Sequence, residues 1–247
     1  MNVLLIIPAY NEEKSILTTI ENVETFQAKG FELDYLVVND GSSDQTLQLL
    51  KENNKNVLSL VHNLGIGGSV QSGYKYAFEN DYDIAVQFDG DGQHDINSLP
   101  DVIEPLLKEE ADFSIGSRFV KKSDDNFQSS LMRQFGIKVI SQFIKLTAGI
   151  KIYDVTSGYR AANKKIIKLL AENYPVRYPE PESTVYISKH GYSIKEVPAN
   201  MFERKDGKSS ISPINSIAYM IDVCLSILLL SFKKTNKKDD SSQTKID

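Results

Sequence analysis

Residues 84–93 read IAVQFDGDGQ, an apolar run that ends in two aspartates with a glycine between them. The apolar part shows no alternation of polar and apolar residues, which predicts a strand covered on both faces of a parallel sheet. Glycine lets the chain turn sharply after the strand and bring the oxygens of Asp89 and Asp91 together. Mg²⁺ and Mn²⁺ prefer such hard oxygen ligands and complete their shells with substrate phosphates and water. The stretch therefore predicts an α/β fold with a metal site of Asp89 and Asp91, to which the Gln93 amide could add a ligand.

Short apolar runs of the same kind recur along the chain and alternate with helical patterns. The runs predict strands at residues 3–7, 33–38, 57–61, 84–88, 112–116 and 192–197. The patterns predict helices at residues 12–27, 46–52, 67–79, 96–109, 131–146 and 163–172. Alternating strands and helices imply right-handed crossovers and a doubly wound, mostly parallel sheet flanked by helices. The chain has 247 residues, which suffice for one large α/β domain, and we place this domain at residues 1–210.

Four successive predicted strands are followed by polar or glycine-rich turns, at residues 8–13, 39–44, 62–68 and 89–94. Ligands of doubly wound sheets bind beyond the carboxyl ends of the strands, so these turns predict one shared site. In the second turn, Asp40 could accept a hydrogen bond from a base or a ribose. The glycines of the third turn lack the G-x-G-x-x-G spacing of dinucleotide-binding folds and predict only a helix N-terminus that faces the ligand. An EF-hand is excluded for the fourth turn, because His94 and Pro100 stand where its glycine and glutamate belong.

The overall composition excludes several classes of protein. A net charge of −5 argues against general nucleic-acid binding, which needs a basic surface. The single cysteine, Cys224, cannot form an intrachain disulfide, which fits a reducing compartment. The apolar run at residues 3–7 is short, has no basic residue before it and stops at Pro8, so it predicts a first strand and not a signal peptide. The polar stretches 121–128 and 203–210 predict loops.

The order of these turns resembles the motif order of the family 2 glycosyltransferases, enzymes with the Rossmann-like GT-A fold. Residues 8–13 match the family's opening motif, residues 39–42 its nucleotide motif and residues 89–91 its metal-binding D-x-D. The likeness extends from Met1 to about Ser210. The chain has no tryptophan, so it lacks the Q-x-x-R-W motif of the processive polysaccharide synthases of this family.

The second half of the chain resembles the dolichol-phosphate-mannose-synthase-like branch, whose acceptor is a polyprenyl phosphate. The stretches that carry this likeness are residues 116–118, Arg133, residues 154–160, residues 178–182, Glu203, Arg204 and residues 208–210. The resemblance implies that Asp89, Asp91 and Gln93 hold Mg²⁺ or Mn²⁺ on the donor's diphosphate. The residues that it implies around the nucleotide are Pro8, Tyr10, Glu12, Asp40, Asp89, Gly90 and Asp91. The residues that it implies in catalysis are Asp91, Arg118, Arg133 and Arg204.

The resemblance also implies an inverting transfer by direct displacement, in which the metal and nearby cations offset the charge on the departing diphosphate. The three arginines would contact phosphate groups through paired hydrogen bonds, with Arg204 as the candidate for the lipid phosphate. A phosphate acceptor is already ionised near neutral pH, so positioning suffices and no general base is needed. Glu180 and Glu182 are candidates for orienting the donor sugar or contacting the arginines. By analogy with bacterial relatives, we expect UDP-glucose or UDP-N-acetylglucosamine as donor and undecaprenyl phosphate as acceptor.

Residues 211–232 form a largely apolar segment with one charged residue, Asp222. Its polar or amphipathic positions recur every three or four residues, at Ser212, Asn215, Tyr219, Asp222 and Ser226. This spacing predicts an amphipathic helix whose place is a membrane surface, a small membrane-protein partner or a second copy of the chain. It also allows a helix folded onto its own domain. Lysines in the tail 233–247 suit an anionic leaflet, so we expect peripheral or monotopic attachment at the cytoplasmic face of the cell membrane.

Two other functions are compatible with the sequence. The first is a family 2 enzyme that glycosylates a hydroxyl of a polysaccharide or a protein, which a lipid-extractable product would exclude. The second is a non-catalytic membrane scaffold that binds a sugar nucleotide, and the intact metal motif argues against it. Members of the family often have two clear transmembrane helices near the C-terminus, and this sequence does not.

Overall fold

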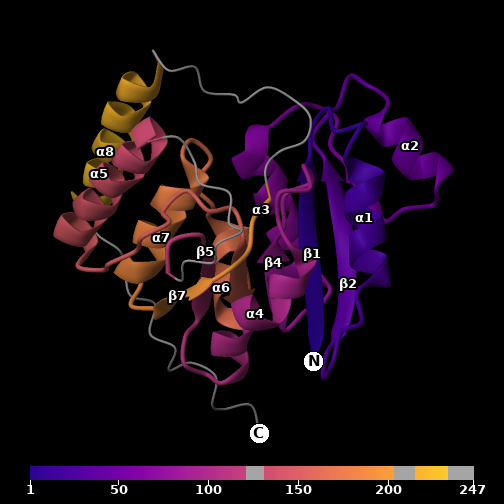
Figure 1. Cartoon of the computed structure of the whole chain (residues 1–247), viewed down its shortest axis with the longest axis horizontal. Coiled ribbons are helices and arrows are strands. Elements are labelled where there is room, and N and C mark those ends of the chain that lie inside the picture. Colours follow the sequence, from indigo (N-terminus) through magenta and orange to yellow (C-terminus); the bar gives the residue numbers. More distant parts are fainter. Residues whose placement is uncertain (121–130, 203–214, 233–247) are drawn as a thin grey trace, which may run out of the picture.

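The computed structural model describes residues 1–120, 131–202 and 215–232, in which a central sheet lies between helices (Figure 1). Seven strands form this sheet in the order β3-β2-β1-β4-β6-β5-β7. Their bounds are β1 Asn2–Ala9, β2 Glu32–Asn39, β3 Val57–Ser59, β4 Ile84–Gln87, β5 Phe113–Ser117, β6 Arg160–Asn163 and β7 Ile194–Pro198. β6 pairs antiparallel with β4 and with β5, and the other pairs are parallel. The predicted α/β fold, with a mostly parallel sheet flanked by helices, is confirmed.

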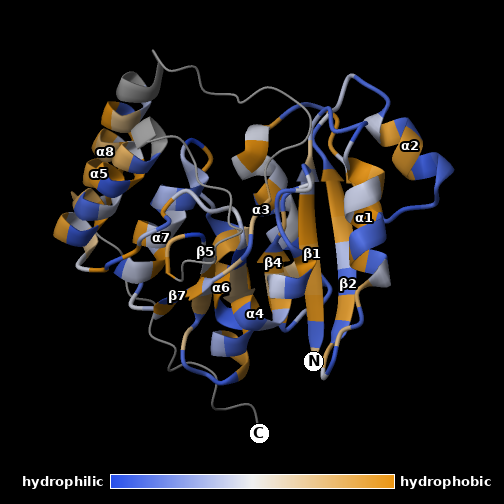
Figure 2. Ribbon diagram, in the orientation of Figure 1, coloured by the Kyte–Doolittle hydropathy of each residue, from blue (hydrophilic) through white to orange (hydrophobic). Residues whose placement is uncertain are grey.

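Helices cover both faces of the sheet because its strands bury side chains on both sides. In β1, Val3, Leu5 and Ile7 point to one face, and Leu4 and Ile6 point to the other. The first face is covered by α1 Ile16–Thr25, α2 Thr46–Glu52, the 3₁₀-helix η1 Ile96–Ser98 and α4 Leu99–Leu107. The second face is covered by α3 Gly65–Glu79, α6 Lys164–Glu172 and α7 Pro179–Lys189. α5 Leu131–Ala148 and α8 Asn215–Phe232 extend the same core and pack on α7 and on each other. Figure 2 shows the apolar strands between these two layers.

The sequence did not predict β6 and α7. β6 has only four residues and begins with Arg160, whereas apolar runs mark the other strands. α7 begins with residues 179–182, whose sequence PEPE is typical of a loop. Proline is nevertheless tolerated in the first turn of a helix, and acidic side chains there suit the helix dipole. Smaller differences affect the ends of predicted elements, and the loops predicted at residues 121–128 and 203–210 lie outside the described residues.

Arg160, the first residue of β6, connects α7 to the segment that leads into this strand. Its side chain is 1% exposed, and its guanidinium group donates to acceptors on α7 and on the residues just before β6. These acceptors are the carbonyl oxygens of Val155, Ser157 and Glu180 and the hydroxyls of Ser183 and Thr184. A buried charge is tolerated where hydrogen bonds replace its hydration, so the first turn of α7 is held beside the start of β6.

α8 packs on α5 and α7, and its polar stripe faces its own domain. Val223 and Ile227 are fully buried against the core. Asp222 lies 3.4 Å from the Arg177 guanidinium and accepts a 3.3 Å hydrogen bond from the Tyr178 hydroxyl. The other described members of the stripe contact α7 or the residue before it: the Tyr219 ring meets Tyr178 edge-on, and the Ser226 hydroxyl donates to Glu182.

At least three members of the polar stripe make contacts within the domain, as in the helix folded onto its own domain that the spacing also allowed. Ser212 lies outside the described residues, and for Asn215 only the backbone is described. Within the described residues, no helix has the length and apolar character needed to cross a membrane. The basic tail 233–247 lies outside the described part of the chain.

Replacing Arg160 by methionine should lower the free energy of unfolding by about 3 kcal/mol, because buried carbonyl and hydroxyl acceptors lose their donor. Urea unfolding followed by circular dichroism measures this loss. Lys51→Met, on the exposed side of α2, is the control and should change the free energy by less than about 0.5 kcal/mol. Equal losses in the two variants would contradict the role given to Arg160.

Candidate active site

The turns that follow β1, β2, β3 and β4 meet at one edge of the sheet. The Asp40 N–H after β2 donates a 2.9 Å hydrogen bond to the Ala9 carbonyl at the end of β1. The Asp40 carboxylate accepts a 2.7 Å bond from the Leu64 N–H, which holds the turn between β3 and α3. Gly90, after β4, approaches β1 so closely that an added Cβ would lie 3.0 Å from the Pro8 carbonyl oxygen. The structure therefore brings together the four turns that the sequence placed at one site.

The turns after β1 and β2 are joined by hydrogen bonds between their backbones and side chains. Asn11 adopts a left-handed conformation, with φ at 56°, and its side-chain oxygen accepts a 2.8 Å bond from the Ser43 N–H. The Glu12 N–H donates to the Thr46 hydroxyl at 2.9 Å. Tyr10, which precedes Asn11, is 48% exposed, so its ring is accessible. The arrangement fixes the turns that carry the nucleotide-contacting residues implied by the family resemblance.

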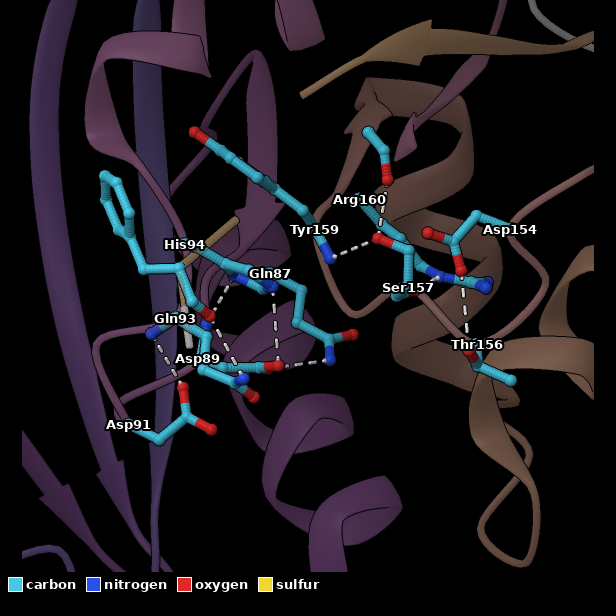
Figure 3. Close-up of polar contacts among 12 residues, drawn as sticks. Gln87, Asp89, Asp91, Gln93, His94, Asp154, Thr156, Ser157, Tyr159 and Arg160 are labelled. Atoms are coloured by element: carbon cyan, nitrogen blue, oxygen red, sulfur yellow. Dashed lines mark hydrogen bonds and ion pairs between the residues drawn. The ribbon is translucent and has the colours of Figure 1, made fainter. Parts of the chain in front are cut away.

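Asp89 and Asp91 lie on the turn that leaves β4 (Figure 3). The Asp91 carboxylate accepts a 3.0 Å bond from the Gln93 N–H, which closes the turn. The Gln93 side-chain amide donates to the Phe202 carbonyl at 3.3 Å, and the Phe202 N–H returns a 2.7 Å bond to the Gln93 carbonyl. Gln93 as a metal ligand therefore stays a prediction, and the structure assigns it a contact with the segment after β7.

Two carboxylates at an exposed edge fit a hard divalent ion. The Asp89 side chain is 33% exposed, so solvent and ligands can reach it. Mg²⁺ and Mn²⁺ are bound by one or two carboxylates with further ligands from phosphates and water, and the donor set here matches that chemistry. Among the described residues, no group of three or more His, Cys, Asp or Glu side chains could hold a metal ion.

Arg118, after β5, is held in a two-pronged pair with Asp154. Its Nε lies 2.8 Å from Asp154 Oδ2 and its terminal nitrogen 2.7 Å from Oδ1. Asp154 is fully buried, and Glu196 on β7 supports it by accepting the Tyr153 and Asp154 N–H groups at 2.8 and 2.7 Å. Burial raises the pKa of the Glu196 carboxyl. A phosphate contact by Arg118 stays a prediction, and the sequence reasoning missed Glu196, which lies in an ordinary strand pattern.

The other two arginines implied in catalysis cannot be placed. Arg133 lies in the first turn of α5, where only the backbone is described, and Arg204 lies outside the described residues.

Glu180 and Glu182, on α7, have different surroundings. Burial raises the pKa of both carboxyls, but Glu180 interacts with the Gln87 amide next to Asp89, whereas Glu182 accepts from Ser226 on α8. Glu180 therefore belongs to the neighbourhood of the aspartate turn, and Glu182 to the contact between helices.

Three residues around Asp89 were not assigned roles from the sequence. The Gln87 amide lies 3.4 Å from Asp89 Oδ1, and a Cβ on Gly158 would lie 2.6 Å from Asp89 Oδ2. His94 is buried, and its Nδ1 accepts a 3.0 Å bond from the Asp89 N–H. Gln87 lies inside an apolar run, and a polar residue in a buried strand was the one sequence signal that could have identified it.

A doubly wound sheet with a D-x-D turn at its carboxyl edge is the architecture of the GT-A glycosyltransferases. The sequence model of the family described as glycosyl transferase family 2 matches residues 4–170, and the chain belongs to this family. It is a glycosyltransferase, as the sequence predicted.

Curated relatives extend over most of the chain. It is 33% identical to a UDP-N-acetylglucosamine–dolichyl-phosphate N-acetylglucosaminyltransferase of Methanococcus voltae, over 79% of this chain and 84% of the relative. It is 30% identical to an undecaprenyl-phosphate mannosyltransferase of Micrococcus luteus, over 86% and 88%. These relatives confirm the likeness to the polyprenyl-phosphate branch.

The fold is also similar to that of a solved enzyme. The structure of glucosyl-3-phosphoglycerate synthase from Mycobacterium tuberculosis, in complex with Mn²⁺, UDP-glucose and phosphoglyceric acid, matches with a TM-score of 0.66. The match covers 95% of this chain and 81% of that one, at 16% identity. It shows that the two chains share a fold.

His94 should make the stability of the metal-free protein depend on pH. Burial lowers its pKa from 6.5 to about 4, so between these pH values the unfolded chain binds a proton that the folded chain excludes. The folded state therefore loses stability as the pH falls, by about 3 kcal/mol between pH 7 and pH 4. We expect urea unfolding in a metal chelator to give this extra loss in the wild type relative to His94→Gln. Parallel pH profiles for the two proteins would show that the ring is not held neutral by burial.

Proposed function

We propose that this glycosyltransferase transfers a sugar, with inversion, from a UDP-sugar to a polyprenyl phosphate, with undecaprenyl phosphate as acceptor. The observation that carries the proposal is the meeting of the Asp89–Asp91 turn with the Asp40 turn at one sheet edge. The metal motif and the nucleotide motif thus lie close enough to hold one nucleotide diphosphate. The donor sugar is glucose or N-acetylglucosamine, and the named Methanococcus relative uses the second of these.

In this proposal, the protein's own groups position the donor. Asp89 and Asp91, with Gln93, would hold Mg²⁺ or Mn²⁺, and Pro8, Tyr10, Glu12, Asp40 and Gly90 would surround the nucleotide. The ion would offset the charge that builds on the departing diphosphate. The solved glucosyl-3-phosphoglycerate synthase supports this assignment, because its complex contains Mn²⁺ together with UDP-glucose.

The proposed acceptor explains why the site needs no general base. A phosphate is ionised near neutral pH and attacks without losing a proton, so correct placement is sufficient. Arg118, Arg133 and Arg204 would contact phosphate groups, as the family resemblance implies. Arg118 is paired with Asp154 in the protein without ligand, which keeps its guanidinium in a fixed orientation. The relatives from Methanococcus and Micrococcus support a polyprenyl acceptor, because their names give a dolichyl and an undecaprenyl phosphate.

We also propose that the protein attaches to the cytoplasmic face of the membrane through α5 and α8, which lie side by side (Figure 1). The polar stripe of α8 lies along α7, and part of the helix's apolar surface faces outward: Leu225 is 52% exposed and Leu229 73%. On α5, Phe135 is 63% exposed and Leu146 81%. Exposed lysines 138 and 145 on α5 suit anionic headgroups beside this apolar surface. A partner helix of a small membrane protein or of a second copy is the other proposed occupant of this face.

A lipid-product assay tests the acceptor. Full-length protein, Mn²⁺ and vesicles that contain undecaprenyl phosphate should move label from UDP-glucose or UDP-N-acetylglucosamine into an organic extract. Asp91→Asn should lower this rate at least about 100-fold, because the ion loses a charged ligand that stabilises the transition state. Lys51→Met is the activity control. Label that appears only in a polysaccharide or protein would instead establish a hydroxyl acceptor.

A vesicle-binding assay tests the attachment surface. Leu225→Glu combined with Leu229→Glu should weaken binding to phosphatidylglycerol vesicles at least about tenfold, since two apolar contacts are lost and two negative charges are added. Phe78→Glu, which also replaces an exposed apolar residue but on α3, should leave binding unchanged. Sedimentation with the vesicles measures the bound fraction. Unchanged binding of the double variant would remove α8 from the attachment surface.

A further inference from the structure

Both ring nitrogens of His94 face Asp89 (Figure 3). Nδ1 accepts the Asp89 N–H at 3.0 Å, and Nε2 lies 3.5 Å from Asp89 Oδ2. The second distance is longer than a well-formed N–H···O bond, but it leaves no room for a water molecule between the two atoms. One side chain therefore contacts the backbone and the carboxylate of the same aspartate.

The first of these contacts fixes the tautomer of the ring. A backbone N–H can only donate, so Nδ1 must carry a lone pair, and the neutral ring then has its proton on Nε2. Nε2, which then carries the proton, lies 3.5 Å from the Asp89 carboxylate. The contact of Nδ1 with the backbone N–H thus favours the neutral ring in this tautomer.

The ring itself is held rigidly by its neighbours. It stacks on Tyr159 with the ring centres 4.8 Å apart and an angle of 16° between the planes. Phe88 meets it edge-on at 5.4 Å, and the backbone of His94 forms a bridge with Met201. A ring packed on two sides cannot turn its nitrogens away from Asp89 without disturbing the core.

The Asp89 carboxylate is also confined from the other sides. The Gln87 side-chain nitrogen lies 3.4 Å from Oδ1, and the Tyr174 hydroxyl lies 3.5 Å from Gln87 Oε1. Gly158 packs against the carboxylate, where any Cβ would come within 2.6 Å of Oδ2. Both oxygens therefore have a defined direction before any ligand is bound.

We propose that His94 is the positioning residue for Asp89: its Nδ1 holds the Asp89 backbone, and its Nε2 side, 3.5 Å from Oδ2, keeps this carboxylate in place for the divalent ion. The inference rests on the metal role proposed above for Asp89 and Asp91. A ligand that is already oriented loses less freedom when the ion binds, and removal of such supporting contacts commonly lowers metal affinity about 10- to 100-fold.

Two substitutions separate the two contacts of His94. Asn at this position can place an acceptor near Nδ1 for the Asp89 N–H but has no donor near Oδ2. Gln can place an amide N–H near Nε2 and keeps the contact with the carboxylate. Mn²⁺ binding, followed by electron paramagnetic resonance without donor or acceptor, should weaken about tenfold or more in His94→Asn and about threefold or less in His94→Gln.

A second measurement uses the wild type alone and does not depend on the folding of a variant. ¹⁵N NMR of labelled histidine, assigned by the peak lost in His94→Gln, should show His94 with its proton on Nε2 at neutral pH. A proton on Nδ1, or equal Mn²⁺ affinities of His94→Asn and wild type, would overturn the proposal for His94. No Mn²⁺ binding by the wild type would instead overturn the metal role of the two aspartates.

Discussion

Parallel pairing of β1 with both β2 and β4 is the constraint on which the site depends. In this register Ala9 lies opposite Asn39, and Ile6 lies opposite Gln87. The residues that follow these strands therefore leave the sheet at the same edge, because parallel strands all end on one side. Asp40 and Asp89 therefore lie near one another directly after paired strands. The pairing of the buried strands places them there, without a long loop.

In the second half of the chain, β6 and α7 follow no clear pattern in the sequence, so tertiary contacts must hold them in place. A four-residue strand that starts with arginine has no apolar run to mark it, and PEPE suits the first turn of a helix but is also typical of a loop. Arg160 holds the two regions together, because its buried guanidinium donates at once to acceptors on α7 and to the carbonyl of Ser157, just before β6. The same connection places Gly158 against Asp89, so the structural role of Arg160 and the shape of the site are linked.

α8 shows that an amphipathic pattern does not by itself identify what the polar stripe contacts. The spacing allowed a membrane surface, a partner or the helix's own domain, and in the structure Asp222 and Ser226 contact residues on or next to α7. A stripe of hydrogen-bonding side chains is equally satisfied by water, by a headgroup or by another helix of the same chain. Because the polar stripe lies along α7, Leu225 and Leu229 stay exposed, and the proposed attachment uses this apolar surface.

The sequence by itself determined the class of fold, the four strand-end turns and the D-x-D motif, because apolar runs and turn residues are local properties of the chain. It also indicated the family, through the order of its motifs. Only the tertiary structure decided which side chains surround Asp89, since His94, Gln87 and Gly158 reach it from the same turn, from within the strand and from a segment about seventy residues away. Contacts across that separation depend on how the elements pack, and a local pattern does not contain that information.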